Sequence, residues 1–348
     1  MAETMRAAVL HKVGDIRIEQ VPRPTITSPN EALVRIKAVG ICGSDMHFYQ
    51  RGRIGEFVVR APLILGHEAA GEVVAVGEAV SGLEPGERVA IEPGRTCRRC
   101  EFCKSGRYNL CTDEAFLATP PVDGAFCEYL AWPADFLFKL PAQMSYEEGA
   151  MMEPLAVGVQ AVRLAGVGVG DSVAVLGAGP IGLVTIQAAR AAGATLVIAT
   201  DPLPSRRSLA AELGAEAVVD AADDVPGASA ELTSGRGVDV AIDCVGLPET
   251  IGQALTIVRR GGHVQLVGMA VDTVEQFPVF AILGKELSLR GTFRYANCYP
   301  VALGLVAAGL VKVAPLITHR FALDQVASAM DFVAANKDQV IKAIIQPA

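Results

Sequence analysis

The sequence predicts an α/β protein of two domains, one rich in β-strands and one built on a doubly wound parallel sheet. Three observations lead to this expectation. The chain of 348 residues exceeds what one hydrophobic core usually fills, and its 51% hydrophobic and 20% charged residues exclude a disordered chain. Its first third alternates apolar and polar residues, as half-buried strands do. From about residue 156, continuous apolar runs alternate with alanine-rich helical stretches, which is typical of a parallel sheet covered on both faces.

In the β-rich part, alternation predicts strands at residues 15–19, 32–37, 71–76 and 88–91. In the second part, apolar runs predict buried strands at residues 173–176, 196–199, 238–242 and 264–267. After Arg290 the alternation of buried strands and helices stops. Helical segments near 300–309 and 324–335 then precede a last strand at 343–345. We therefore expect the chain to return to its first domain. The predicted domains are residues 1–155 with 292–348, and residues 156–291.

Charge and hydropathy limit the partners. The formal net charge is −8 and no basic stripe occurs, which argues against nucleic acid. The longest uncharged stretch, residues 172–189, is a poor membrane span because three glycines and a proline interrupt it. No signal-type apolar core occurs near the N-terminus. A cytoplasmic protein without a nucleic-acid or membrane partner is expected.

A glycine-rich loop, Gly177-Ala-Gly-Pro-Ile-Gly182, fits the fingerprint of a dinucleotide-binding turn. It follows a predicted strand and begins a helix, so Gly177 would make the tight turn and Gly179 would admit the diphosphate. Gly182 would let helix and strand pack closely. Ordinary turn glycines are the alternative, which the order of strand, loop, helix, strand and acid disfavours. The loop residues assigned to the cofactor are Gly177, Gly179, Pro180, Ile181 and Gly182.

The cofactor type follows from the end of the next strand. Asp201 is placed to accept the ribose hydroxyls and would repel a 2′-phosphate, which favours NAD over NADP. Arg206 and Arg207 leave NADP as the alternative cofactor, because arginine is the residue that accommodates a 2′-phosphate. We interpret Arg206 as lying beside the adenosine. Further contacts on the nicotinamide side are expected at the ends of later strands, from Cys244, Val267, Gly268 and Met269.

Four of the eight cysteines lie within fifteen residues: Cys97, Cys100, Cys103 and Cys111. Four thiolates in one loop predict a closed, tetrahedral structural zinc site. An iron–sulfur cluster fits the spacing as well, but no redox partner motif lies nearby. A disulfide scaffold is not expected in a chain of this length without an export signal.

A second, dispersed set consists of Cys42, His67, Glu68 and Glu153. A thiolate, an imidazole and a carboxylate would leave a fourth zinc position open to water or substrate. Each residue alone is ambiguous, because a lone cysteine is usually a small core residue.

These motifs together resemble the medium-chain, zinc-dependent alcohol dehydrogenases. The segment from Gly66 to Gly77 resembles that family's zinc signature, and the cysteine cluster and glycine loop follow it in the expected order. The likeness is greatest to the polyol (sorbitol/xylitol) dehydrogenases, through residues 42–47, 52–55, 118–121, 153–155, 291–295 and 315–321. It implies a GroES-like catalytic domain formed by residues 1–155 and 292–348, with a Rossmann domain between them.

The resemblance also implies roles. Cys42, His67 and Glu68 would hold the catalytic zinc, and Glu153 would contact it through a water; the sequence leaves open which glutamate binds directly. Ser44 would pass the substrate proton toward His47, and Asp45 would orient the imidazole of His67. For Ser44 and Asp45, the alternative is a helix-capping pair.

The substrate pocket is implied in the same way. Phe116, Thr119, Arg294 and Tyr295 would surround the polyol together with Glu153. For Arg294 the alternative is a surface or interface cation. Phe48 departs from the polyol pattern, which has a tyrosine there, although Tyr49 is adjacent.

The expected activity is therefore reversible oxidation of a secondary hydroxyl of a polyol to the ketose, with NAD and two zinc ions, one catalytic and one structural. A homo-oligomer, a tetramer or dimer, is implied by the resemblance. The alternatives are a dehydrogenase of a vicinal diol or of threonine, and a noncatalytic protein that retains the fold.

Overall fold

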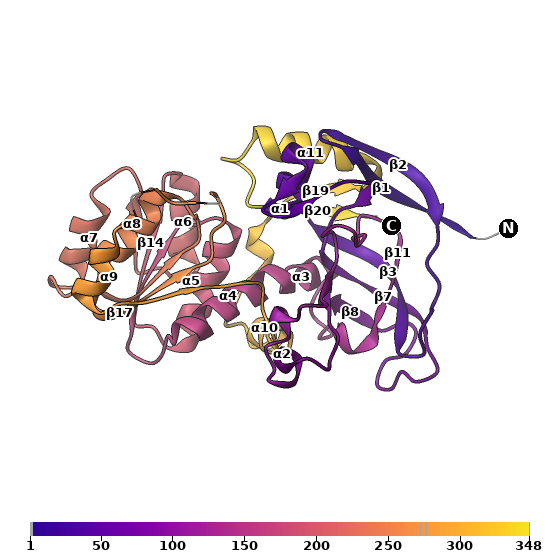
Figure 1. Cartoon of the computed structure of the whole chain (residues 1–348), viewed down its shortest axis with the longest axis horizontal. Helices are drawn as coiled ribbons and strands as arrows, with labels where there is room; N and C mark the ends of the chain where they lie inside the picture. The colour runs from indigo at the N-terminus through magenta and orange to yellow at the C-terminus, as the bar shows by residue number, and fades with distance from the viewer. Residues whose placement is uncertain (1–2, 272, 276, 348) are drawn as a thin grey trace. The chain divides into compact units, whose positions relative to one another are not determined.

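The computed structural model describes residues 3–271, 273–275 and 277–347. The chain divides into two compact units, both drawn in Figure 1. The first unit contains Met1–Glu153 and Val313–Ala348, and the second contains Pro154–Lys312. The predicted fold class is confirmed, since the second unit holds a parallel sheet between helices and the first is mainly β.

The first unit is organised around a seven-stranded sheet in the order β12-β8-β7-β3-β20-β19, with β11 also paired to β3. It also contains a three-stranded sheet, β2-β1-β6, and two two-stranded sheets, β4-β5 and β9-β10. Its strands are β1 (Thr4–Lys12), β2 (Asp15–Pro22), β3 (Glu31–Gly40), β4 (Arg53–Ile54), β5 (Phe57–Val58), β6 (Leu63–Ile64), β7 (Glu68–Val76), β8 (Arg88–Ile91), β9 (Gly94–Arg95), β10 (Ala115–Phe116), β11 (Tyr129–Pro133), β12 (Leu137–Lys139), β19 (Ile317–Ala322) and β20 (Lys342–Gln346). Its helices are α1 (Gly43–Arg51), α2 (Glu101–Lys104), α3 (Tyr146–Ala150) and α11 (Val326–Ala335), with short 3₁₀ turns η1 (Tyr108–Leu110), η2 (Ala134–Phe136), η3 (Ala314–Leu316) and η4 (Leu323–Gln325).

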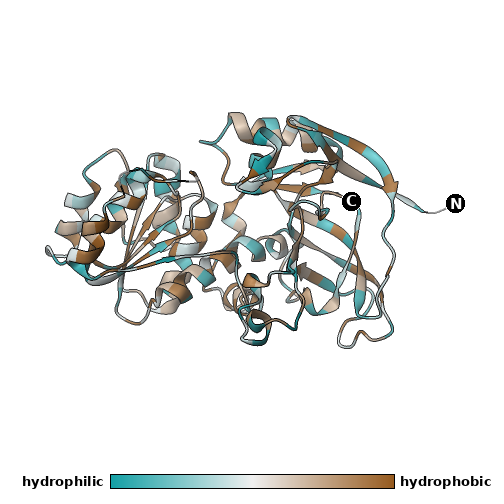
Figure 2. Cartoon of the chain, in the orientation of Figure 1, coloured by the Kyte–Doolittle hydropathy of each residue, from teal (hydrophilic) through white to brown (hydrophobic). Residues whose placement is uncertain are grey.

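Apolar side chains explain why these strands close into one body. Val34, Ile36 and Val39 of β3 are fully buried, as are Val73 of β7 and Ile345 of β20. Figure 2 shows the hydrophobic residues concentrated along the strands. Burying such a stripe is the main favourable contribution to folding.

The second unit contains a six-stranded, all-parallel sheet in the order β15-β14-β13-β16-β17-β18. This order reverses beside β13, which is the first strand of this sheet along the chain, as in dinucleotide-binding folds. The strands are β13 (Ser172–Leu176), β14 (Leu196–Asp201), β15 (Ala217–Asp220), β16 (Val238–Asp243), β17 (Val258–Leu266) and β18 (Ser288–Gly291). The helices are α4 (Met152–Ala165), which begins at the end of the first unit, α5 (Pro180–Ala192), α6 (Pro204–Glu212), α7 (Val225–Leu232), α8 (Pro248–Ile257), α9 (Val279–Lys285) and α10 (Tyr299–Ala307).

Residues 292–312 belong to the second unit, although the sequence analysis assigned them to the first domain. Hydrogen bonds explain the difference. The thiol of Cys298 lies 3.3 Å from the amide oxygen of Gln160 in α4. The side chain of Gln187 in α5 bonds both the N–H and the carbonyl of Lys312, at 2.7 and 3.1 Å. Two helices therefore tie this segment to the second unit.

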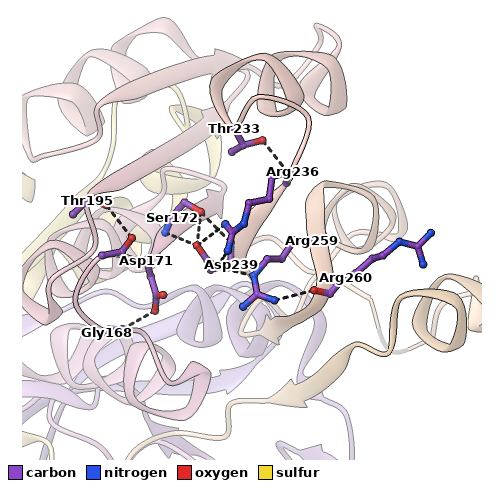
Figure 3. Close-up of polar contacts among 11 residues, drawn as sticks. Gly168, Asp171, Ser172, Thr195, Thr233, Arg236, Asp239, Arg259 and Arg260 are labelled. Atoms are coloured by element: carbon purple, nitrogen blue, oxygen red, sulfur yellow. Dashed lines mark hydrogen bonds and ion pairs between the residues drawn. The ribbon is translucent and has the colours of Figure 1, made fainter.

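A charged cluster joins the amino ends of three neighbouring strands in the second unit (Figure 3). The carboxylate of Asp239 in β16 accepts hydrogen bonds from the N–H and hydroxyl of Ser172 in β13, at 3.0 and 2.7 Å. It also accepts from Arg236 and from Arg259 in β17, both at 2.6 Å. The hydrogen bond from Arg236, together with those from Ser172 and Arg259, holds the pKa of Asp239 well below its usual range despite partial burial.

We expect Asp239→Asn to lower the free energy of unfolding by about 2 kcal/mol at pH 7, because charge-assisted hydrogen bonds on two sides are weakened. A depressed carboxyl pKa contributes stability above the unfolded value of 3.8, and this contribution is lost as the pH falls below it. The deficit should therefore shrink at pH 3. Urea unfolding at both pH values measures it.

Asp171→Asn is the matched control, because Asp171 bonds the N–H of Gly168 within one turn and joins no strands through its side chain. Its effect should stay below about 1 kcal/mol. Equal unfolding midpoints for Asp239→Asn and the wild type at pH 7 would show that the cluster does not stabilise the sheet.

Candidate functional site

Strand register brings three distant segments of the first unit together. Gly40 at the end of β3 pairs with Glu68 at the start of β7 and with Ile344 of β20. Cys42, two residues beyond Gly40, is the N-cap of α1, and His67 directly precedes β7. The end of one strand and the beginnings of two others therefore meet at a single point.

At this point lies the donor cluster, by which we mean Cys42, His67 and Glu68. Their Sγ, ring nitrogen and carboxylate oxygen all lie within 4.8 Å of one another. His67 and Glu68 are buried, and Cys42 is half-buried. One thiol, one imidazole and one carboxylate form the type of donor set that catalytic zinc sites use.

The electrostatics of the cluster favour a cation. Burial alone lowers the pKa of His67, but the charge and hydrogen bond of Cys42, with the charges of Asp45 and Glu153, raise it to about 10. The surrounding groups therefore stabilise positive charge at this position. The residues present fit a divalent metal ion.

Asp45 fixes the backbone on both sides of the cluster. Its fully buried carboxylate accepts the N–H groups of Cys42 and Gly66, each at 2.9 Å. Its distance to Nδ1 of His67 is 3.8 Å, which is an ion-pair contact and longer than a hydrogen bond. Asp45 thus holds the peptide groups next to Cys42 and His67, and it also occupies the capping position considered as its alternative. Its predicted role in orienting His67 stays a prediction.

Glu153 lies in the first turn of α4 and is buried. Among the described residues it is not one of the three whose donor atoms converge within 4.8 Å, yet its charge acts on His67. Ser44 and His47 both lie in α1 and are three residues apart, so they share a helix face.

The predicted pocket residues fall in both units. Phe116 is buried with its ring centroid 5.5 Å from that of His67, and the N–H of Thr119 bonds the carbonyl of Phe116 at 3.1 Å. Arg294 and Tyr295 belong to the second unit, so the four-residue pocket stays a prediction. Arg294 has a φ of 50°, in the left-handed region that non-glycine residues rarely adopt.

Tyr49 does not replace the hydroxyl that Phe48 lacks. Its phenol donates a 2.7 Å hydrogen bond to Asp331 of α11. Burial and this carboxylate raise the pKa of Tyr49 to about 12. The phenol therefore joins α1 to α11.

Lys342 is a residue of the site that the sequence analysis missed. Its ammonium is buried and lies 2.6 and 2.7 Å from the two carboxylate oxygens of Glu68. Burial lowers the pKa of Lys342, but the charges of Glu68 and Cys42 outweigh burial and raise it above its ordinary value. No motif marked this lysine, because only the pairing of β20 with β3 brings it here.

Cys97, Cys100, Cys103 and Cys111 form the cysteine lobe, and their Sγ atoms also lie within 4.8 Å of one another. All four are free thiols. Hydrogen bonds from the backbone N–H groups of Arg99 and Cys100 lower the pKa of Cys97 to about 6. Four converging sulfurs with a stabilised thiolate fit a closed zinc site.

The glycine loop lies at the carboxyl edge of the parallel sheet, between β13 and α5. Gly177 has a φ of 90°, and a Cβ there would lie 2.5 Å from a methyl group of Val245. A Cβ on Gly182 would lie 1.8 Å from the carbonyl oxygen of Gly177. Both positions require glycine. The N-terminus of α5, with Pro180 and Ile181 in its first turn, lies at this loop, and a helix N-terminus is a position that suits a diphosphate.

Asp201 ends β14 at the same edge, and its carboxylate accepts the N–H groups of Ala178 and Leu203 at 2.9 Å each. It therefore shapes the glycine loop itself. Arg206 lies 3.8 Å from Asp201, and its guanidinium is the nearest group to a Cβ built on Gly179.

The remaining predicted cofactor contacts follow β16 and β17 at this same edge. The N–H groups of Val267 and Gly268 bond the carbonyl of Asp243, at 2.9 and 3.0 Å, and Cys244 comes directly after that residue. The side chain of Met269 is 64% exposed. Parallel strands place these residues at one edge because all their carboxyl ends point the same way.

Glu92 is a second residue that the sequence analysis missed. It is 1% exposed; Oε1 accepts a 2.7 Å hydrogen bond from Tyr108 of the cysteine lobe, and Oε2 has no partner among the described residues. Burial raises its pKa to about 7, aided by Glu114, Glu153 and Asp135, while the Tyr108 hydrogen bond opposes the shift.

Comparison with known proteins extends over the whole chain. Residues 28–142 match the family model of the alcohol dehydrogenase GroES-like domain, and residues 180–308 match that of zinc-binding dehydrogenases. The sorbitol dehydrogenase of Bacillus subtilis is 44% identical over 350 residues, covering 99% of this chain and 98% of that protein. Sorbitol dehydrogenase 1 of Saccharomyces cerevisiae is 46% identical over 347 residues, covering 97% of each.

Solved structures agree in fold. The 2R,3R-butanediol dehydrogenase of Bacillus subtilis is 37% identical with a TM-score of 0.89, covering 99% of this chain and 100% of that one. A Sinorhizobium meliloti protein bound to NADP is 36% identical, with a TM-score of 0.90 and the same coverage. An Escherichia coli short chain alcohol dehydrogenase with NADH is 30% identical, with a TM-score of 0.91 and 99% of each chain covered. Within the described residues, no helix is both long and apolar enough to span a bilayer.

Replacing Glu92 by Gln tests the cost of its burial. Because the folded-state pKa is raised from 4.5 to about 7, wild-type stability falls as the pH rises through this interval. Relative to wild type, the stability gain of Glu92→Gln should grow from below about 1 kcal/mol at pH 5 to on the order of 3 kcal/mol at pH 8, in urea unfolding.

Tyr108→Phe is the control for this prediction. It removes the donor that stabilises the carboxylate of Glu92. The Tyr108→Phe protein should therefore be less stable than the wild type at pH 8. A Glu92→Gln protein with wild-type stability at both pH values would contradict the proposed protonation.

Proposed function

The chain belongs to the family of medium-chain, zinc-dependent alcohol dehydrogenases, and we propose that it oxidises a secondary hydroxyl of a polyol, of the sorbitol or xylitol type, reversibly to the ketose with NAD. It is an oxidoreductase that acts on CH–OH groups. The observation that carries the proposal is the converging set Cys42, His67 and Glu68 in a chain 44–46% identical to sorbitol dehydrogenases over nearly its full length.

Two metal sites are proposed. Cys42, His67 and Glu68 would hold a catalytic zinc, with Glu153 near it through a water, and the cysteine lobe would hold a structural one. When bound, the catalytic zinc supplies a Lewis acid for the substrate hydroxyl, and the nicotinamide supplies the hydride acceptor. Four sulfur ligands leave no position for substrate, so the lobe would act only in folding.

The protein's own residues supply proton transfer and orientation. Ser44 would take the proton of the substrate hydroxyl and pass it to His47, one turn further along the same face of α1. Asp45 keeps the peptide groups beside Cys42 and His67 in place. Preorganisation of this kind lowers the cost of reaching the reactive geometry.

NAD is proposed as the cofactor on the position of Asp201, whose negative charge would repel a 2′-phosphate. Gly177, Gly179 and Gly182 support it by the space they leave at the N-terminus of α5. The similarity to proteins solved with NADP and with NADH supports a nicotinamide cofactor of either form. Arg206 would lie beside the adenosine.

A polyol substrate would be recognised by polar groups. By the resemblance, Glu153, Thr119, Arg294 and Tyr295 would bond its hydroxyls, and Phe116 would pack against its carbon chain. Removing a polar partner from a substrate hydroxyl costs much more selectivity than removing a methylene. A vicinal diol is the second candidate substrate, supported by the 37% identity to a butanediol dehydrogenase.

A homo-oligomer, a tetramer by the resemblance, is also proposed. Its support is an apolar surface on the second unit, where Val279, Phe280 and Leu283 of α9 are 57%, 82% and 71% exposed. The adjacent edge strand β18 is exposed along its length. Exposed apolar patches and unpaired strand edges are typical of protein contacts. A cytoplasmic location is proposed because all eight cysteines are free thiols.

Metal analysis tests the two sites separately. The wild type should contain two zinc ions per chain, and Cys100→Ser should contain one and unfold at a lower temperature, because a structural zinc contributes directly to folding. Cys42→Ser should also contain one zinc but lose turnover. Elemental analysis and thermal unfolding measure both effects.

Cys127→Ser is the control. Among the described residues, this buried thiol bonds the carbonyls of Gly124 and Tyr129 and belongs to neither metal set. It should retain two zinc ions. One zinc in the wild type, unchanged in Cys100→Ser, would exclude the structural site.

The function itself is tested by reduction of NAD and of NADP against sorbitol, xylitol, 2,3-butanediol, threonine and ethanol. We expect the highest kcat/KM with a polyol and NAD, by at least about tenfold over ethanol, because an apolar alcohol leaves the polar pocket groups unpaired. Turnover confined to butanediol or threonine would keep the metal and cofactor proposals and reject the polyol. Lack of turnover with every alcohol would reject the proposed activity.

A further inference from the structure

The ion pair between Lys342 and Glu68 is almost completely buried. Its side chains are 3% and 1% exposed, and the ammonium bonds both carboxylate oxygens at 2.6 and 2.7 Å. The same ammonium donates a 3.1 Å hydrogen bond to the carbonyl of Ile41, next to Cys42. Lys342 therefore contacts two of the segments that form the donor cluster.

Glu68 is confined on its other side by the backbone of β3. A Cβ built on Gly40 would lie 1.9 Å from Oε2 of Glu68, so the carboxylate occupies the space that a side chain would fill. With Gly40 beneath it and Lys342 bonding both oxygens, the carboxylate has little freedom to rotate. Its position relative to Cys42 and His67 is thus set by two residues outside the cluster.

Stability alone does not account for this arrangement. Removing two charges from water costs several kcal/mol each, and replacing a buried ion pair by apolar residues is often neutral or stabilising. The pair lies within the donor set for a metal ion, where it can alter the ligands that the ion receives. A role in the chemistry of the site explains the buried lysine better than a role in folding.

We propose that Lys342 is a positioning residue that holds Glu68 by both oxygens and so limits how strongly this carboxylate binds the catalytic metal. This inference rests on the proposed function, because it requires a metal ion at Cys42 and His67. A thiolate and an unrestrained carboxylate together cancel the charge of a divalent ion. The ammonium offsets the negative charge of the carboxylate. The metal ion therefore keeps positive charge for the substrate oxygen, and one of its ligand positions stays open.

Cobalt in place of zinc reports the ligands without any substrate, through its visible absorption. Lys342→Met removes the ammonium at similar length and should free Glu68, changing the cobalt spectrum and lowering kcat about tenfold with an unchanged KM for NAD. Lys342→Arg keeps charge and donors and should restore most of both properties. The intact cysteine lobe contributes equally in all variants, so it cancels in difference spectra.

The decisive comparison uses Glu68→Gln and the double variant that combines Glu68→Gln with Lys342→Met. The double variant contains no unpaired buried charge at this pair, so it can be measured even if Lys342→Met alone does not fold. If Lys342 acts through Glu68, its replacement should leave the cobalt spectrum of Glu68→Gln unchanged. A similar spectral change in both backgrounds, or none in the wild-type background, would overturn the proposal. A cobalt spectrum insensitive to Cys42→Ser would instead reject the metal site of the proposed function.

Discussion

The pairing of β3 with β7 on one side and β20 on the other is the constraint on which the site depends. Gly40 marks the position where all three strands meet, and a one-residue slip would turn every side chain to the opposite face. Because apolar side chains of β3 are buried, the register is strongly specified. The core thus fixes the site's geometry, although the buried apolar side chains of β3 are not among the proposed site residues.

The first unit carries an unusual amount of buried charge for a β-rich core. Asp45, Glu68, Glu92, Glu153 and Lys342 are all at most 5% exposed. Each of the charged groups lowers stability unless a partner offsets its loss of hydration. Asp45 and Glu68 have such partners, while Oε2 of Glu92 has none in the part of the chain that the structure describes. Functional sites commonly retain interactions that a core optimised for stability would replace.

Local patterns predicted much of this structure. The strand at residues 88–91 was predicted with its observed bounds, and the glycine loop lies between strand and helix as its spacing required. The cysteine set converges because its members lie within one short lobe. Lys342 and Glu92 carried no local signal, since their importance comes from neighbours distant in sequence. The predicted boundary near residue 292 follows the end of the alternating strands and helices, whereas the compact second unit continues to Lys312 through contacts with helices.

The order of segments along the chain has a consequence for biosynthesis. Lys342 and Glu68 are 274 positions apart, and β20 lies between β3 and β19 in the sheet. Domains generally fold in the order in which the ribosome releases them. The second unit is released whole before β20, while the first unit waits with an incomplete sheet. The donor cluster therefore forms only after β20 has been released and has paired with Val39 and Gly40 of β3.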